Sequence, residues 1–338
     1  MGKYKNISYA LLFLMVPALS SGQALFQNLG GERVGTAVFP FLKIETSAYG
    51  AGMAGTGVAF PRDASSVFYN PTAISHIPKR DLVLFHLNLP ADIDYEYFAF
   101  SSPLGRVSHI GISYGALHME PMMETTEYMP FGTGKTFIYR DEFAALTYSM
   151  RMSDRFTVGT TVKYAHETID NLTMGGVLLD FGTLYMTGFR SLRIATSLTN
   201  FGAQSKPNGA YTKTILDEHG DPVVEGSQKY QSFSPPTAFR LGAAYEIIET
   251  PQNRLTTSFQ LTHPADNAEN YAFGFDYLFL NTLSLRCGYI LNVEGFGLSL
   301  GAGVEVDLPG AIKLRADYAF TQVDYLTDPQ RFSIGFSL

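Results

Sequence analysis

The sequence predicts an all-β fold, a 14-stranded antiparallel transmembrane β-barrel that follows a short N-terminal plug or hatch segment. Between Leu82 and Leu338, short segments alternate apolar and polar residues, aromatic residues recur in the apolar rows, and the connections are of two lengths. Successive side chains of a strand point to opposite faces, so each segment would meet an apolar phase on one side and a polar phase on the other. This pattern is typical of outer-membrane barrels.

Residues 312–320 show the alternation most clearly. Lys313, Arg315 and Asp317 alternate with apolar neighbours, and the same period of two closes the chain, where Phe332 and Phe336 share one face. We expect strands at residues 82–89, 95–102, 106–117, 137–150, 155–168, 173–186, 191–202, 236–247, 252–262, 268–279, 281–291, 296–306, 310–320 and 330–338.

The connections indicate the orientation of the barrel. Residues 103–105, 152–154 and 307–309 form tight turns, whereas 118–136 and 203–235 are long loops. Bacterial barrels have short periplasmic turns and longer external loops, so we expect both long loops outside the cell. A soluble β-sandwich also alternates. It does not need aromatic rows on nearly every strand, which favours the membrane barrel.

The chain divides into three predicted parts. Residues 1–22 have a basic start, an apolar centre and small residues before Gln23, as in a secretory signal peptide. Residues 23–81 form the periplasmic plug or hatch segment, and residues 82–338 form the barrel. The lone Cys287 has no partner for a disulfide. We therefore expect a multi-pass protein of the cell outer membrane after signal-peptide cleavage.

Charged residues of both signs are predicted to line the lumen in nearly equal numbers: Lys163, Glu167, Asp180, Arg193, Arg240, Glu246, Asp276, Arg286, Glu305, Lys313, Arg315 and Asp317. This suits a network of ion pairs, although a substrate path lined by the same side chains is the alternative. The predicted network consists of Arg193, Arg240, Arg286, Glu305, Lys313, Arg315 and Asp317.

The composition argues against several classes of function. The formal net charge is −7, and the basic clusters that nucleic acid requires are missing, so no nucleic-acid partner is expected. The histidines do not stand at metal-ligand spacing, and no nucleophile motif occurs. We expect a non-enzymatic protein with no catalytic residues, no metal and no cofactor.

The loop at 118–136 is a candidate partner-contact surface. Exposed methionines and aromatic residues form adaptable docking surfaces. The alternative is that they pack within the loop or on the loop at 203–235. The candidate residues are Met122, Met123, Tyr128, Met129 and Phe131.

The plug segment is rich in residues that shape the backbone. Glycines permit positive φ and close approach, Pro71 fixes a turn and biases Asn70 towards extended geometry, and Asp63 can accept bonds from nearby amides. These residues are structural or binding candidates, with turn formation and no ligand contact as the alternative. The candidates are Gly50, Met53, Gly55, Asp63, Asn70 and Pro71.

These motifs carry a family resemblance. Phe41-Leu42-Lys43-Ile44, the Gly/Met-rich stretch, Asp63-Ala64-Ser65 and Asn70-Pro71 resemble the N-terminal signature of the PorV/PorQ family, relatives of the FadL-type fourteen-strand barrels of Bacteroidota. This chain departs from the signature at Thr72, where the family commonly has Ala, and lacks its Arg before the Gly/Met stretch.

The resemblance implies two functions. The PorV/PorQ side implies a component of the type IX secretion system that binds the translocon barrel and the C-terminal sorting domains of secreted cargo, and shuttles cargo to surface attachment. The FadL side implies a transporter of small hydrophobic compounds, with residues 23–81 as a hatch and an opening in the wall. A channel needs a continuous apolar path, whereas the inward faces are predicted to be polar almost throughout, which favours the secretion role.

Overall fold

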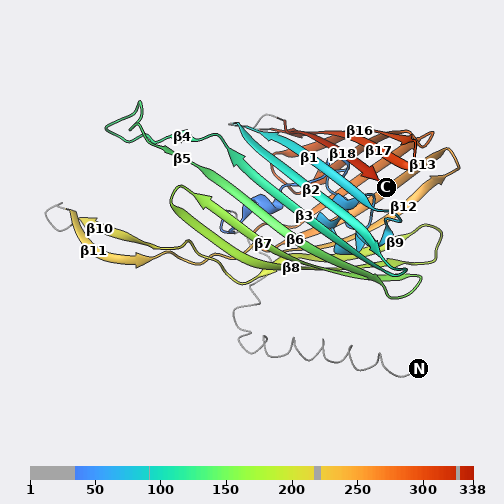
Figure 1. The fold of residues 1–338 in the computed structure, drawn as a ribbon, viewed down its shortest axis with the longest axis horizontal. Helices are drawn as coiled ribbons and strands as arrows, with labels where there is room; N and C mark the ends of the chain where they lie inside the picture. Colours follow the sequence, from blue (N-terminus) through green and yellow to red (C-terminus); the bar gives the residue numbers. More distant parts are fainter. Residues whose placement is uncertain (1–34, 91, 217–221, 325–327) are drawn as a thin grey trace, which may run out of the picture.

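The computed structural model describes residues 35–90, 92–216, 222–324 and 328–338. The predicted signal peptide and residues 23–34 of the predicted plug segment lie outside the described residues. Figure 1 shows a barrel of long tilted strands with the short helical turns of the N-terminal segment inside it. Within the described ranges, no helix is both long and apolar enough to cross a membrane.

The barrel confirms the predicted fold class. Fourteen antiparallel strands close into one sheet, and the first strand, β1, pairs with the last, β18. Each predicted strand is present, with ends that differ by a few residues. The strands of the wall are β1 (Asp81–Leu89), β2 (Ile93–Leu104), β3 (Ser108–Met119), β6 (Tyr139–Arg151), β7 (Phe156–Ile169), β8 (Leu172–Met186), β9 (Arg193–Gly202), β12 (Ala238–Glu249), β13 (Asn253–Pro264), β14 (Asn270–Phe279), β15 (Leu283–Leu291), β16 (Phe296–Leu308), β17 (Ile312–Val323) and β18 (Gln330–Ser337).

The alternation of the sequence becomes an apolar outer surface. On β15, Leu285 and Tyr289 are exposed, whereas Ser284 and Arg286 between the outward positions are buried against the lumen. The same arrangement recurs on β18, where Ile334 faces outward. A barrel satisfies all backbone hydrogen bonds within its closed sheet, so such an apolar exterior can face lipid.

The two ends of the barrel differ. Tight connections at 105–107, 152–155 and 309–311 share one end, which we call the short-turn end, and both long connections leave from the long-loop end. The long connections, predicted as loops, also contain short strands. They form two-stranded hairpins beyond the wall, β4 (Met122–Met123) with β5 (Thr136–Phe137) and β10 (Ala210–Leu216) with β11 (Pro222–Lys229). The two strands of each hairpin pair with each other outside the barrel wall. They therefore do not need the alternation of apolar and polar residues that a wall strand needs.

The N-terminal segment threads the lumen. It enters at the long-loop end, where Ala37 bridges Ser234, and leaves at the short-turn end, where β1 begins at Asp81. Residues 35–80, which we call the plug, therefore lie inside the barrel. Their elements are η2 (Pro40–Lys43), α2 (Ala48–Gly52), η3 (Ala64–Phe68) and η4 (Pro71–His76).

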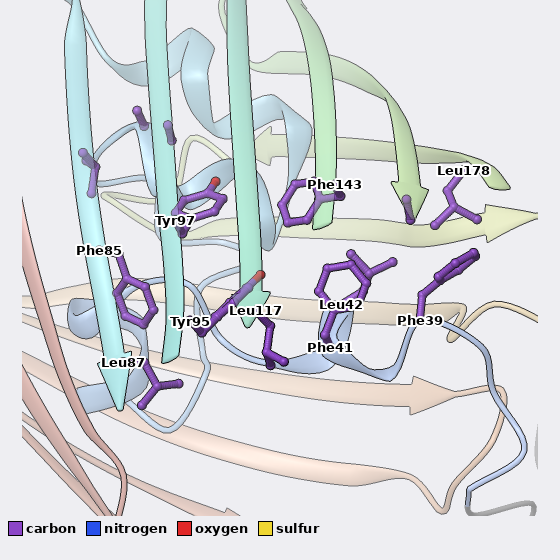
Figure 2. Packing of buried hydrophobic residues seen from close by; sticks show 14 of the residues in the cluster. Phe39, Phe41, Leu42, Phe85, Leu87, Tyr95, Tyr97, Leu117, Phe143 and Leu178 are labelled. Carbon is purple, nitrogen blue, oxygen red and sulfur yellow. The ribbon is translucent and has the colours of Figure 1, made fainter. Parts of the chain in front are cut away.

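An apolar cluster joins the plug to one side of the wall. Figure 2 shows Phe41 and Leu42 of the plug beside inward-facing aromatic residues, among which the ring centroids of Phe41 and Phe143 are 6.2 Å apart. Inward Phe85 and Leu87 of β1 are also buried. The prediction that the inward faces are polar almost throughout is therefore wrong on this side. Apolar lumen positions are stable there because the plug removes them from water.

Inward glycines of the wall make room for the plug backbone. A Cβ at Gly288 would lie 2.3 Å from the carbonyl carbon of Met53, and a Cβ at Gly159 would lie 2.7 Å from that of Pro71. No real side chain tolerates such contacts without displacement of the neighbouring backbone. These glycines thus fix how closely α2 and η4 approach β15 and β7.

Candidate functional site

Two cavities lie at opposite ends of the lumen, and they share no lining residue. The outer cavity, at the long-loop end, has a volume of about 470 Å³. The inner cavity, at the short-turn end, has a volume of about 780 Å³. The plug lies between them, so each cavity occupies one end of the lumen.

Apolar side chains dominate the outer cavity. They come from the plug, from the ends of wall strands and from the connections at the long-loop end. The apolar lining consists of Ile44, Ala54, Leu87, Leu89, Pro90, Ile290, Val293, Phe296, Val323 and Pro329. A cavity of this size and character, with a few polar groups, suits a small apolar molecule.

Three charged residues also line the outer cavity. Lys43 pairs with Asp266, and the Arg331 Nη1 donates to the Thr321 Oγ1 at 3.0 Å. Burial raises the pKa of Glu45 above its usual range, which the nearby positive charge of Arg331 opposes. Glu45 forms no ion pair among the described residues. The cavity thus combines apolar walls with a carboxyl group that protonates more readily than a solvated one.

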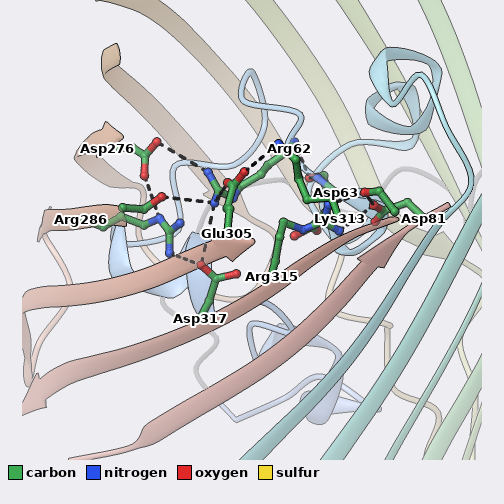
Figure 3. Close-up of polar contacts among 12 residues, drawn as sticks. Arg62, Asp63, Asp81, Asp276, Arg286, Glu305, Lys313, Arg315 and Asp317 are labelled. Carbon is green, nitrogen blue, oxygen red and sulfur yellow. Dashed lines mark hydrogen bonds and ion pairs between the residues drawn. The ribbon is translucent and has the colours of Figure 1, made fainter. Parts of the chain in front are cut away.

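A cluster of charges fastens the plug to the opposite wall (Figure 3). The Arg62 Nη2 donates to the Glu305 Oε1 at 2.5 Å, and its guanidinium lies 3.8 Å from Asp276 and 3.9 Å from Asp317. Arg286 binds the same two aspartates at 2.8 and 2.6 Å. The Arg62 side chain is only 5% exposed, so solvent screens these contacts weakly.

A second pair links the plug to the closing strands. The Arg315 Nη2 donates to the Asp81 Oδ2 at 2.6 Å, while the other oxygen of Asp81 accepts the Ala64 N–H at 2.9 Å. Ser337 also donates to Asp81 at 2.6 Å. One carboxylate thus joins β17, β18 and the start of η3.

The remaining predicted lumen arginines bind the plug separately. Arg193 donates to the Ala59 carbonyl at 2.7 Å and to Glu246 at 2.6 Å. Arg240 donates to Thr199 at 2.6 Å, and its guanidinium lies 5.7 Å from the ring centroid of Phe68.

The predicted network is thus several clusters rather than one. Arg286, Glu305, Lys313 and Asp317 come together, whereas Arg193, Arg240 and Arg315 each make separate contacts. Sequence reasoning missed Arg62, the residue that connects the largest cluster to the plug. The sequence does mark this residue, because Arg62 is the only arginine or lysine between Lys43 and Lys79 in the plug segment.

The six plug candidates shape the plug, and none of them lines the outer or the inner cavity. Asp63 caps η3 by accepting the Ser65 N–H at 3.0 Å, and Asn70 caps η4. Pro71 is the first residue of η4, and Met53 is fully buried.

Two of the six candidates, Gly50 and Gly55, are glycines at which another side chain occupies the position that a Cβ would take. Gly55 has φ +80°, and a Cβ there would lie 2.2 Å from the Glu45 Oε1. A Cβ at Gly50 would lie 2.1 Å from the Tyr69 hydroxyl. Their contacts support the structural alternative more than a role in binding.

The candidate partner-contact residues lie on the β4–β5 hairpin. Tyr128 and Phe131 are 91% and 96% exposed, and Met122, Met123 and Met129 are also exposed. The structure therefore does not bury them within the loop. Figure 1 shows this hairpin extending away from the wall, apart from the β10–β11 hairpin.

No model of a known protein family matches this chain, and no curated protein matches its sequence. Within the described ranges, no group of three or more His, Cys, Asp or Glu residues could hold a metal ion.

Solved structures share the fold. The monoaromatic hydrocarbon channel CymD superposes with a TM-score of 0.56 at 11% identity, over 86% of this chain and 96% of that chain. The toluene transporter TodX of Pseudomonas putida superposes with a TM-score of 0.56 at 12% identity, over 87% of this chain and 97% of that chain. A FadL homologue of Pseudomonas aeruginosa superposes with a TM-score of 0.52 at 13% identity, over 86% of this chain and 97% of that chain.

The fold of this chain is therefore that of the FadL-family outer-membrane barrels. CymD is named as a channel and TodX as a transporter. The narrower PorV/PorQ assignment rests on the plug motifs alone and stays a prediction.

Proposed function

We propose that this protein is an outer-membrane channel for small hydrophobic compounds. The observation that carries the proposal is the apolar outer cavity, which opens at the long-loop end against the plug. Because external loops of bacterial barrels are the longer ones, this end faces outside the cell. The shared fold with proteins named as a hydrocarbon channel and a toluene transporter supports the same function.

Passage in this proposal requires the plug to rearrange. The outer and inner cavities are separate, and the plug between them is held by the Arg62 cluster on one side and by the apolar cluster on the other. A hydrophobic solute would enter the outer cavity because burial of its surface there is favourable. Displacement of the plug would then connect the two cavities.

The test is uptake of radiolabelled toluene by Gram-negative cells that lack their own FadL-type channels. Cells that make this protein should take up toluene faster than cells with the empty vector, and the difference should saturate with concentration. Equal initial rates, with the barrel shown to be folded in the outer membrane, would refute the channel proposal.

One observation favours the second candidate, a component of the type IX secretion system. Two nearly fully exposed aromatic residues, Tyr128 and Phe131, project from the outer end on a hairpin that contributes no wall strand. Aromatic side chains are enriched at protein interfaces. In this proposal the hairpin contacts the translocon barrel or a cargo sorting domain.

Gentle solubilisation from the native membrane, followed by mass spectrometry, separates the two candidates. Co-purification of a large translocon barrel or of secreted cargo, lost in a Tyr128→Ser/Phe131→Ser variant, would support the secretion role. A matched Tyr211→Ser/Tyr230→Ser variant alters two tyrosines of the other long connection, whose ring centroids lie 5.3 Å apart. Recovery of the barrel without protein partners would count against this candidate.

A further inference from the structure

The inner cavity is locally basic, although the whole chain has a formal net charge of −7. Its lining has a formal surplus of two positive charges. The basic residues of the lining are Arg62, Lys79, Arg193, Arg254, Lys313 and Arg315, and the acidic residues are Asp81, Glu246, Glu305 and Asp307. His76 also lines the cavity, but burial lowers its pKa to about 4, so it adds no charge near neutral pH.

Ion pairs engage most of the acidic groups. Three of the four carboxylates are bound: Glu246 by Arg193, Asp81 by Arg315, and Glu305 by both Arg62 and Lys313. Asp307 forms no ion pair with the described residues, and Arg62 and Lys313 share Glu305. The two basic lining residues that have no carboxylate partner in the described structure are Lys79 and Arg254.

Arg254 is the more unusual of the two. Lys79 donates to the Ala311 carbonyl at 2.6 Å. Arg254 forms no side-chain hydrogen bond or ion pair with the described residues, and its buried Nε has no partner. Glu249 stands opposite Arg254 in the β12–β13 ladder, yet the two side chains form no ion pair. A partly buried guanidinium without a partner carries a desolvation cost that a bound anion would offset.

We propose that the inner cavity binds a small oxyanion, with Arg254 as its principal contact. A guanidinium presents planar, paired N–H donors that match the oxygens of a phosphate or carboxylate group. The surrounding surplus of positive charge attracts such a group, and Lys79 contributes to this field. The oxyanion belongs either to a soluble solute or to a phospholipid headgroup at this end of the barrel.

Phosphate binding can be tested separately from solute passage, since the inner cavity lies on the other side of the plug from the outer cavity. Inorganic phosphate is the first probe, titrated calorimetrically into the full-length protein in a zwitterionic or neutral detergent. We expect saturable binding that weakens about tenfold or more in Arg254→Gln, because a charge-assisted contact is lost. Arg254→Lys keeps the positive charge but lacks the planar pair of N–H donors. Its affinity for phosphate should lie between that of the unmodified protein and that of Arg254→Gln.

The matched control is Arg155→Gln, which removes an exposed arginine from a turn at the same end without altering the cavity lining. This variant should bind phosphate as the unmodified protein does. Circular dichroism and the heat-induced gel shift of folded barrels verify that each variant is folded. Absence of saturable binding, or equal affinity in Arg254→Gln, overturns the proposal.

Two arms distinguish the sources of the oxyanion. Phosphate binding to delipidated protein supports a soluble ligand. Native mass spectrometry of protein taken from bilayers that contain phosphatidylglycerol tests the other source. A retained lipid that inorganic phosphate displaces, and that Arg254→Gln does not retain, supports the headgroup.

Discussion

Arg62 of the plug and Glu305 of the wall are joined by a hydrogen-bonded ion pair of 2.5 Å, across 243 positions of the chain. Both side chains are largely buried, and Asp276 and Asp317 complete the acidic surroundings of the guanidinium. Removal of one partner from a buried pair leaves uncompensated charge, which is costly. Arg62 therefore ties the plug to β16 through a buried ion pair.

Arg62→Gln should release the plug. We expect the free energy of unfolding to fall by about 3 kcal/mol, the lower end for a broken buried pair, since Arg286 still binds both aspartates. Planar-bilayer recordings should show a higher conductance than the unmodified protein. Arg155→Gln is the control, and unchanged conductance and stability in Arg62→Gln would contradict the role of this cluster.

Gly288→Ala should displace α2 from β15. The added Cβ would meet the Met53 carbonyl carbon at 2.3 Å, and the overpacking should cost about 1–3 kcal/mol. Gly297→Ala on β16 is a matched control, because the nearest atom to its Cβ lies at 3.8 Å. Chemical unfolding of both variants in the same detergent measures the difference. An equal effect of the two substitutions would show that the close contact is unimportant.

Ile290→Trp should obstruct the outer cavity. Ile290 lines this cavity, and a larger side chain there would reduce its volume. In the toluene assay we expect uptake to fall towards that of cells without the protein. Ile334→Trp is the control, since Ile334 faces outward. The chain contains no tryptophan, so the emission of each variant reports its single indole. Undiminished uptake in Ile290→Trp would argue against entry through this cavity.

His76 should make the stability of the plug depend on pH. Burial, followed by the positive charge of Arg151, lowers its pKa from 6.5 to about 4, and its Nε2 lies 3.1 Å from the Thr157 Oγ1. The unfolded chain then binds a proton at higher pH than the folded one, so stability falls as the pH is lowered from about 6.5 towards 4.

The loss from His76 should not exceed about 3 kcal/mol. Thermal unfolding between pH 7 and pH 4 measures it, and His76→Gln should flatten the part of the profile that this group causes. A variant with the same pH profile as the unmodified protein would show that His76 does not titrate between the two states.

In the lumen, the sequence pattern predicted which side chains point inward but not which residues they contact. The alternation around Arg315 predicted that this side chain points into the barrel, and in the structure the side chain is buried. The pattern did not identify Asp81 as its partner, because the two residues are 234 positions apart and meet only when the sheet closes. The apolar inward face at Phe85 was also missed, since an alternating strand does not reveal which lumen positions a plug will cover.

The sequence by itself determined the number of strands in the barrel wall, their approximate limits and which side chains face lipid. These are local properties, because a period of two within one segment assigns its faces whatever the neighbouring strand is. The tertiary structure alone decided that the plug threads the lumen, that Arg62 meets Glu305, and that separate apolar and basic cavities lie at the two ends. Those features depend on contacts between distant segments, and only closure of the barrel around the plug brings them together.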